Sequence, residues 1–430
     1  MRLIENLSYL IQLRQHAVAP LAWCQRCLLV LPFIATCAYP ATWNLDTVLR
    51  EAVTQHPDVR ARRDEQQSAN DRLDAARWGR FPSLTGDVRT QPSGPQSIAK
   101  LEQPLWFGGR IGGQIDASTA DLKVAGASLG EMQLDVLQRS AAAFFEVLRL
   151  EGRLKAAIAN ESEHALLLKI IQRRVQAEVS PKTDETQAAA RWQQAKTDRI
   201  QTTRQLDTAR LTLEQLVGAP ASDLSAPERI QIVRWTESSL LDAAISVSPE
   251  RQRLQAQVEA ADAQISLAKS QLVPNVVVGY QSIMGPLFSG QQRTQAYLAL
   301  QVQTGAGLSS FSGVRAAVAK KSAASEAIDA HDRRLTQTVR STWTENVALA
   351  EQVEPVRSLL QGSEEIVASY LRQFQVGRKN WLDVLNAQRE KTQASYSLTD
   401  LEFPLMLSSV KLLLLAGGWD NTTLNLRNAP

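Results

Sequence analysis

Cysteine is scarce in this sequence of 430 residues and occurs only near its beginning, at Cys24, Cys27 and Cys37. The apolar run at residues 28–35 follows Arg26, precedes small residues and is too short to cross a bilayer. We therefore predict a secretory signal peptide over residues 1–38, cleaved near Cys37 or Ala38, with an unusually long leader before Arg26. Lipidation of Cys37 is the alternative, although Thr36 fits poorly before a lipidated cysteine. The predicted mature chain has no cysteine, which excludes disulfides and thiol chemistry.

Aromatic residues and excess charge are scarce as well. Aromatic residues make up 6% of the chain, and the formal net charge is only +3. Lys and Arg alternate with Asp and Glu along the polar-apolar stretches, so the sequence offers no basic face for nucleic acid. This composition favours long helices with solvated surfaces over a globular enzyme.

The motifs of an enzyme are missing too. The histidines are scattered without metal-ligand spacing; they are His16, His56, His164 and His331. No G-x-S-x-G or P-loop pattern occurs, and the glycines at residues 105–113 lack the G-x-G-x-x-G spacing of a dinucleotide-binding loop. The paired carboxylates Glu364 and Glu365 are typical of a solvated helix face. We predict that the protein is not an enzyme and holds no cofactor or metal.

What the sequence does contain is a repeat. A helical pattern pauses and restarts within residues 370–389, which predicts the tip of a helical hairpin. A weaker copy at residues 177–188 aligns with residues 376–387, 199 positions later, so that Asp184 matches Asp383. Two pairs of prolines with equal spacing support the match: Pro57 and Pro82, and Pro249 and Pro274. Matched landmarks in the same order indicate an internal duplication.

Each repeat is predicted to contain short helices, a β-hairpin and a long helical hairpin. Residues 39–240 form the first repeat, with a β-hairpin at about 83–106 and a helical tip at about 173–182. Residues 241–417 form the second repeat, with a β-hairpin at about 273–304 and a tip at about 374–381. Residues 418–430 form a polar C-terminal tail.

Local signals place the helix boundaries. Asn44 is expected to cap a short helix within residues 43–53, and Pro57 to lie in the first turn of the next helix. No strong breaker follows the first glycine junction until residue 172, so about 65 residues are expected to form one helix about 100 Å long. A matching glycine junction at residues 305–315 is expected to precede a second long helix from about residue 316.

The predicted strands alternate in polarity. Leu84, Gly86 and Val88 lie opposite polar residues, and residues 295–303 alternate in the same way. Strands of about ten residues with one apolar face are typical of membrane-spanning β-strands. Four strands cannot close a barrel, and lipid does not tolerate an open sheet edge. The chain must therefore pack its hairpins on a soluble partner or pool them with identical chains.

The tip motif V-G-R-K-N-W-L-D-V-L-N-A-Q-R-E at residues 376–390, with the duplicated plan and the prolines before each hairpin, resembles the TolC family of outer-membrane export channels. The resemblance covers residues 43–417. It implies a fold that is mainly α with a small β part: a homotrimer with a 12-stranded β-barrel, four transmembrane strands per chain, and a periplasmic α-barrel of coiled-coil hairpins. It also implies two partners, a periplasmic adaptor (membrane fusion protein) and an inner-membrane ABC transporter or proton-driven pump.

The resemblance further implies roles for residues at the tips. Three residues that share a helix face by their spacing would line the pore constriction: Asp383, Asn386 and Glu390. Asn386 replaces an aspartate of better-known members, and a merely solvent-facing carboxylate at Asp383 is the alternative. Asp184 and Lys379 would form a gate latch, with Phe374 where a tyrosine helps to hold the gate. The adaptor would dock on the tips, at Val179, Ser180, Pro181, Val376, Gly377 and Arg378.

The cargo stays open at this level. The tip motif and L-W-F-G-G-R-I at residues 105–111 are most similar to members that serve type I secretion of large adhesins. A duct for multidrug or small-molecule efflux is the alternative within the channel class. A soluble periplasmic coiled-coil scaffold, from another class, would explain the helices but neither the signal peptide nor the two-faced strands.

Overall fold

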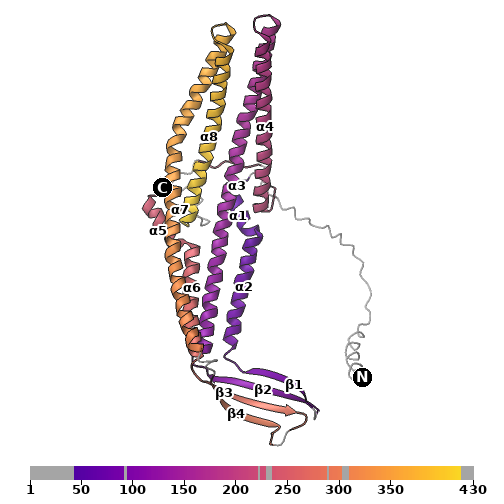
Figure 1. The fold of residues 1–430 in the computed structure, drawn as a ribbon, viewed down its shortest axis with the longest axis vertical. Coiled ribbons are helices and arrows are strands. Elements are labelled where there is room, and N and C mark those ends of the chain that lie inside the picture. Colours follow the sequence, from indigo (N-terminus) through magenta and orange to yellow (C-terminus); the bar gives the residue numbers. More distant parts are fainter. Residues whose placement is uncertain are drawn as a thin grey trace, which may run out of the picture. The chain divides into compact units, whose positions relative to one another are not determined.

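The computed structural model describes residues 43–91, 94–220, 223–228, 235–287, 290–302 and 309–417. Long α-helices dominate these ranges, and four strands form one small sheet (Figure 1), which confirms the predicted mainly helical fold. The predicted signal peptide at residues 1–38, the tail at 418–430 and the glycines at 305 and 307 lie outside the described ranges. None of the described helices carries an apolar stretch long enough to cross a bilayer.

The two halves of the chain have the same order of elements. The first half contains α1 (Leu45–Gln55), α2 (Pro57–Trp78), α3 (Arg110–Gln176) and α4 (Lys182–Val217). The second half contains α5 (Glu237–Val247), α6 (Pro249–Ser270), α7 (Ser309–Gln375) and α8 (Trp381–Leu415). In each half a β-hairpin stands between the second and third helix. The position 240/241, where the sequence divides the two repeats, falls inside α5.

Predicted local signals account for several helix ends. The Asn44 side chain accepts a hydrogen bond from the Thr47 backbone N–H at 2.8 Å and caps α1. Pro57 occupies the start of α2, where a missing N–H costs nothing. Gly218, with a φ of 77°, ends α4 in the left-handed conformation.

One predicted junction is wrong. Residues 311–315 were expected to link strand to helix, but α7 begins at Ser309 and already contains them. A lone glycine such as Gly313 costs a helix only about 1 kcal/mol relative to alanine. That cost does not interrupt a helix of 67 residues. In the same way α3 begins at Arg110 and includes the last glycines of the first junction.

The sheet joins the two halves of the chain. It consists of β1 (Ser83–Gln91), β2 (Gly94–Trp106), β3 (Asn275–Met284) and β4 (Thr294–Gln301), in that spatial order. All neighbouring strands are antiparallel, and the pairing of β2 with β3 merges the two predicted hairpins into one sheet. One row across the sheet reads Leu84, Leu101, Tyr280 and Ala296. The adjacent row reads Thr85, Lys100, Gln281 and Gln295, so neighbouring rows differ in polarity.

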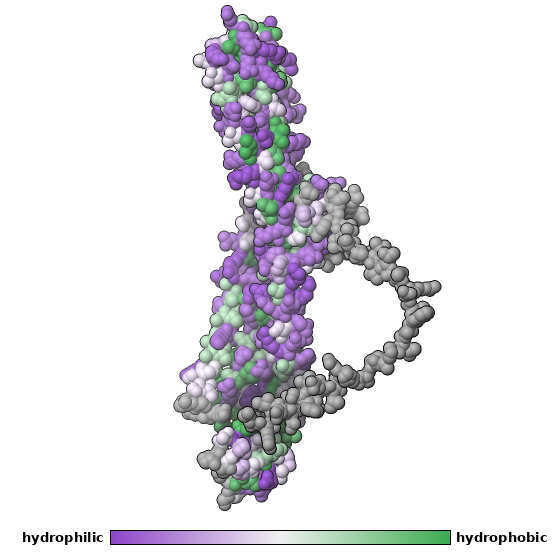
Figure 2. Space-filling model, turned by 90° about the vertical axis from the view of Figure 1, so that its right-hand side faces the viewer, coloured by the Kyte–Doolittle hydropathy of each residue, from purple (hydrophilic) through white to green (hydrophobic). Residues whose placement is uncertain are grey.

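One face of the sheet is apolar and uncovered. Leu84 on β1 and Leu298 on β4 are 76% and 70% exposed. On the opposite face the Tyr297 hydroxyl donates a hydrogen bond to Glu102, two strands away. The Tyr297 ring crosses Gly279 on the intervening strand, where a Cβ would lie 2.4 Å from it. On the side of the molecule shown in Figure 2, hydrophobic residues are more frequent toward the sheet end than along the upper helices.

The two long helical hairpins, α3–α4 and α7–α8, pack side by side through α3 and α8 (Figure 1). Polar bonds join these two helices at several levels. Arg149 of α3 binds Asp400 of α8 at 2.6 Å, and Arg153 binds the same carboxylate at 2.7 Å. The hydrogen bonds that Arg149 donates to Glu146 and Asp400 raise the pKa of Arg149, so its guanidinium stays charged. The main apolar core lies nearby and is contributed by α1, α3, α4 and α8, with Phe144 and Phe145 fully buried at its centre.

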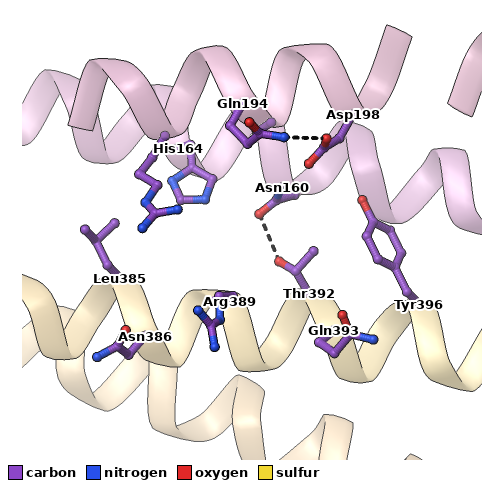
Figure 3. Close-up of a pocket in the computed structure, with 12 residues that line it drawn as sticks. Asn160, His164, Gln194, Asp198, Leu385, Asn386, Arg389, Thr392, Gln393 and Tyr396 are labelled. Carbon is purple, nitrogen blue, oxygen red and sulfur yellow. Dashed lines mark hydrogen bonds between the residues drawn. The ribbon is translucent and has the colours of Figure 1, made fainter. Parts of the chain in front are cut away.

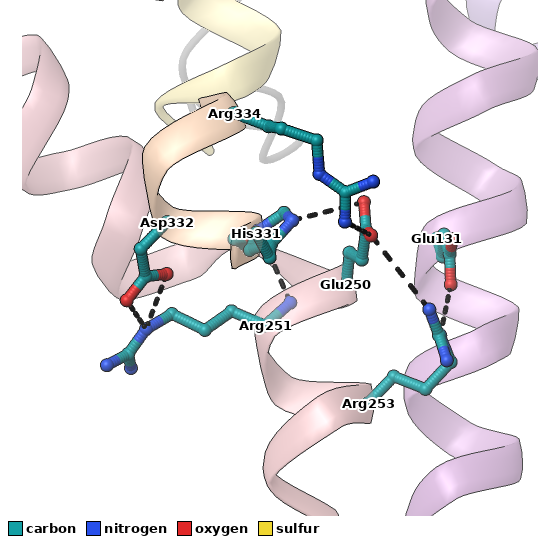
Figure 4. A network of polar contacts seen from close by, with 8 residues as sticks. Glu131, Glu250, Arg251, Arg253, His331, Asp332 and Arg334 are labelled. Atoms are coloured by element: carbon teal, nitrogen blue, oxygen red, sulfur yellow. Dashed lines mark hydrogen bonds and ion pairs between the residues drawn. The ribbon is translucent and has the colours of Figure 1, made fainter. Parts of the chain in front are cut away.

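A second polar network ties α6 to α3 and α7 (Figure 4). Glu250, in the first turn of α6, lies 3.2 Å from His331 Nδ1 and 3.6 Å from Arg334. Arg253 links α6 to Glu131 of α3 at 2.7 Å. The other nitrogen of buried His331 is 3.0 Å from the Ser248 hydroxyl. His331 therefore has a structural role.

Candidate functional site

The two hairpin tips share one backbone design. The first connects α3 to α4 through residues 177–181, and the second connects α7 to α8 through residues 376–380. In the first tip, Val179 N–H bonds to Arg174 C=O at 2.8 Å and Glu178 N–H to Val175 C=O at 3.0 Å. In the second, the bonds from Arg378 to Gln373 and from Gly377 to Phe374 measure 2.9 and 3.1 Å. These pairs, each 199 residues apart, form a Schellman motif that ends a helix.

The residue in the left-handed position differs between the tips. Gly377 has a φ of 75°, and Glu178 at the matching position has a φ of 57°. Glu178 is the one non-glycine residue with positive φ in the described ranges. A side chain in this conformation costs about 1–2 kcal/mol. The first tip therefore reaches the same geometry at a strain that the second avoids.

An apolar cluster holds the two tips against each other. It contains Leu167, Ile171 and Ala188 from the first hairpin and Phe374, Trp381, Val384 and Leu385 from the second. Phe374 is only 4% exposed, and its ring lies 5.8 Å from that of Trp381. The Arg174 guanidinium stacks 4.7 Å from the Phe374 ring, and its Nε donates to the Ser180 hydroxyl at 3.3 Å. Phe374, predicted as part of a gate latch, thus lies in the core between the tips.

Lys379 has partners within its own tip. Its ammonium lies 4.2 Å from the Tyr370 ring centroid and 3.6 Å from the Asp383 carboxylate. Asp383 also accepts a hydrogen bond from the Asn380 N–H at 3.3 Å. In the first turn of α8, its charge complements the helix dipole. Asp184, the other predicted latch residue, lies in the first turn of α4 in the other hairpin.

The three residues predicted for the constriction follow one another along α8. Asp383 is half-buried, whereas Asn386 and Glu390 are exposed. The structure thus leaves all three at least partly accessible, whereas Val384 and Ala387 of the same helix are buried. The predicted docking residues are accessible as well, since Val179 and Val376 at the two tips are 61% and 70% exposed.

A groove next to the tips was missed by sequence reasoning. It lies over α3 between α4 and α8, with a volume of about 240 Å³ (Figure 3). The lining residues are Asn160, His164, Arg191, Gln194, Ala195, Asp198, Leu385, Asn386, Arg389, Thr392, Gln393 and Tyr396. No local sequence motif predicts this groove, because its residues come from three separate helices. Asn386, which was predicted for the constriction, is one of its members.

Burial and charge set the ionisation of two groups in this groove. Burial lowers the pKa of His164, and the charge of Arg191 lowers it further, while Glu163 opposes the shift. Burial and Asp198 raise the pKa of Tyr396, whose ring lies 4.6 Å from the Arg153 guanidinium. Both side chains are therefore neutral near pH 7. Among the residues described, no group of three or more His, Cys, Asp or Glu side chains is placed to hold a metal.

Comparison with known proteins adds sequence relatives. The sequence model of the family described as outer membrane efflux protein matches residues 48–219 and 240–418. The cobalt-zinc-cadmium resistance protein CzcC of Cupriavidus metallidurans is 24% identical over 356 residues, which cover 82% of this chain and 84% of CzcC. The alkaline protease secretion protein AprF of Pseudomonas aeruginosa is 23% identical over 345 residues, which cover 77% of this chain and 71% of AprF.

Solved structures share the fold. The outer-membrane channel OprN superposes with a TM-score of 0.76 at 18% identity, over 87% of this chain and 90% of OprN. The outer membrane protein VceC from Vibrio cholerae gives a TM-score of 0.74 at 16% identity, over 87% of this chain and 96% of VceC.

Proposed function

The chain belongs to the outer membrane efflux protein family, and from this premise we propose that three copies form the exit duct of a tripartite system for type I protein secretion. As a member of this family it is an outer-membrane export channel that extends into the periplasm. We propose in addition that it assembles as a trimer, works with a periplasmic adaptor and an inner-membrane transporter, and exports a large protein.

The sheet is the observation that carries the trimer. Its exposed apolar face suits lipid, while β1 and β4 each have a neighbour on one side only among the strands that the structure describes. Unpaired backbone groups at a sheet edge are too costly in a bilayer, since no water satisfies them there. Three copies joined β1 to β4 would give twelve strands without an open edge. The long hairpins would then continue the duct into the periplasm and end at the tips.

The tips are the proposed site of gating and docking. Asp383, Asn386 and Glu390 would narrow the pore, and the adaptor would bind the six exposed tips of a trimer, two per chain. Lys379 would exchange its contacts within the second tip for Asp184 of a neighbouring hairpin when the entrance closes. Exposed pairs contribute about 0–1 kcal/mol, which suits a gate that a partner must open. If Lys379→Ala and Asp184→Ala leave the single-channel conductance unchanged, the latch has no role.

A large secreted protein such as an adhesin is the proposed cargo. The likeness to AprF, which is named for protease secretion, supports this class. The likeness to CzcC, which is named for metal resistance, supports small-ion efflux as the second candidate. Deletion of the gene separates the two. Loss of a large protein from the surface or medium supports the first, and sensitivity to metal ions or drugs with unchanged secretion supports the second.

Cysteine cross-linking tests the trimer. Each variant would carry one cysteine on β1 and one on β4, at positions scanned along the two strands. In pelleted membranes, these variants should give disulfide-linked species no larger than a trimer. The matched control pairs a cysteine on β2 with one on β4, because β2 is already paired on both sides. Cross-linked trimers from the control pairs, or none from any edge pair, would contradict the proposed assembly.

A further inference from the structure

The groove over α3 gathers positive charge that the protein leaves unpaired. Arg191 of α4 and Arg389 of α8 both line it and are solvent-exposed. Neither guanidinium forms an ion pair with a carboxylate in the ranges that the structure covers. Arg199 and Arg210, farther along α4, each bind a glutamate of α3. Arg191 and Arg389 thus place two guanidinium groups without a carboxylate partner on the groove wall.

The floor of the groove adds hydrogen-bond donors. The Asn160 side-chain oxygen accepts from the Thr392 hydroxyl at 2.9 Å, which leaves its amide nitrogen free to donate. His164 stands beside Asn160 and faces the opening toward Arg389 (Figure 3). The one carboxylate in the lining, Asp198, accepts from Gln194 at 2.8 Å. Positive charge and N–H donors therefore face the same space.

We propose that this groove is a binding site for a small oxyanion, through a phosphate or carboxylate group. Arginine is suited to this task because its planar fork donates two parallel hydrogen bonds to such groups. The groove, at about 240 Å³, is smaller than the range of about 300–1,000 Å³ usual for drug-sized ligands, which favours a small ion.

The site goes beyond the duct function and does not depend on the trimer, because its three helices belong to one chain. Its position nonetheless has a consequence for transport. Asn386 belongs both to the groove and to the proposed constriction, so a bound anion would lie beside the narrowest part of the pore. The anion would place negative charge beside Asn386, which stands where better-known family members carry an aspartate.

Binding of pyrophosphate and of citrate to the purified full-length protein in detergent tests the proposal. Isothermal titration calorimetry at low salt would compare the wild type with the double variant Arg191→Gln/Arg389→Gln. Loss of two charge-assisted contacts should weaken binding by at least about tenfold. The control is Arg372→Gln, because Arg372 is also exposed, near a tip and outside the groove.

Each outcome is decisive. Weakened binding of either anion by the double variant, with normal binding by Arg372→Gln, supports the site. No binding by the wild type, equal binding by the double variant, or equal loss in the control overturns it. These results leave the trimer untouched, since cross-linking of β1 to β4 does not involve the groove.

Discussion

The first and second hairpin tips solve one geometric problem with different residues. Both end a long helix with a Schellman motif, and their matching backbone hydrogen bonds differ in length by 0.1 Å. Yet Glu178 stands where the second tip has Gly377, and Pro181 stands where it has Asn380. The comparison shows that the same turn geometry is kept without the residue that favours it. Packing of the helices on either side of the first tip holds the turn in this conformation.

The tips also differ in what supports them. Phe374 of the second hairpin is buried beneath Arg174 of the first, whereas its counterpart Val175 is half-buried. The second tip thus provides the apolar anchor, and the first provides the cation that covers it. This asymmetry predicts that the two tips respond differently to equivalent substitutions.

Phe374→Ala should have the largest effect. Removal of a buried phenylalanine costs about 3–5 kcal/mol, and it also deprives Arg174 of its stacking surface. Hydrogen exchange of peptides from both tips should rise strongly. Val175→Ala, the matched change in the first hairpin, should cost about 1–2 kcal/mol. Equal effects of the two changes would abolish the proposed asymmetry.

Gly377→Ala and Glu178→Gly should act in opposite directions. A Cβ at Gly377 meets no atom within 4 Å, so alanine there adds only the strain of the left-handed conformation. Alanine also lowers the conformational entropy of the unfolded chain, which offsets part of the strain. The net effect should destabilise the second tip by about 1 kcal/mol. Glu178→Gly should stabilise the first tip by a similar or smaller amount. Hydrogen exchange at residues 177–180 and 376–379 measures both, and a destabilised Glu178→Gly variant would show that Glu178 makes a contact that offsets its strain.

His164 should give the smallest effect, and it depends on pH. Its lowered pKa means that the unfolded chain binds a proton more readily than the folded one. The stability that depends on His164 being neutral is therefore fully present at a pH above 6.5, the ordinary pKa of histidine. It is lost as the pH falls below that value. His164→Gln should flatten this part of the profile for local opening of the α3–α4 hairpin. Between about pH 5 and 7, where histidine titrates, the slope of the opening free energy against pH should differ between wild type and variant. An unchanged slope would exclude His164 as the source of the pH dependence.

The sequence predicted most of the architecture because its signals are local. Helix caps at Asn44 and Gly218, the proline at the start of α2, and the alternating strands each depend on a few neighbouring residues. The pause in the helical pattern located the second tip, and the match of Asp184 to Asp383 located the first, each to within a few residues. Glycines misled the prediction at the start of α7, where the length of the helix outweighs a local penalty.

The site was less accessible to such reasoning. The family resemblance implies a latch between Lys379 and Asp184, which stays a prediction, whereas the contacts of Lys379 with Tyr370 and Asp383 of its own hairpin were not predicted. Contacts between hairpins, such as Arg174 with Phe374, join residues 200 positions apart and have no sequence signature. The groove over α3 likewise needs three helices in register. These features follow from packing, which a linear pattern does not specify.

The most direct test of the central claim is the ion selectivity of single channels in planar bilayers, for the wild type and Asp383→Asn. If three copies place Asp383 around the pore, the wild type should form cation-selective channels that multivalent cations block. Asp383→Asn should reduce both the selectivity and the block. Glu178→Gln, which removes an exposed charge at the first tip outside the latch, should leave the selectivity unchanged. Channels whose selectivity and block are the same with and without the Asp383 charge would contradict a pore that narrows at the second tip.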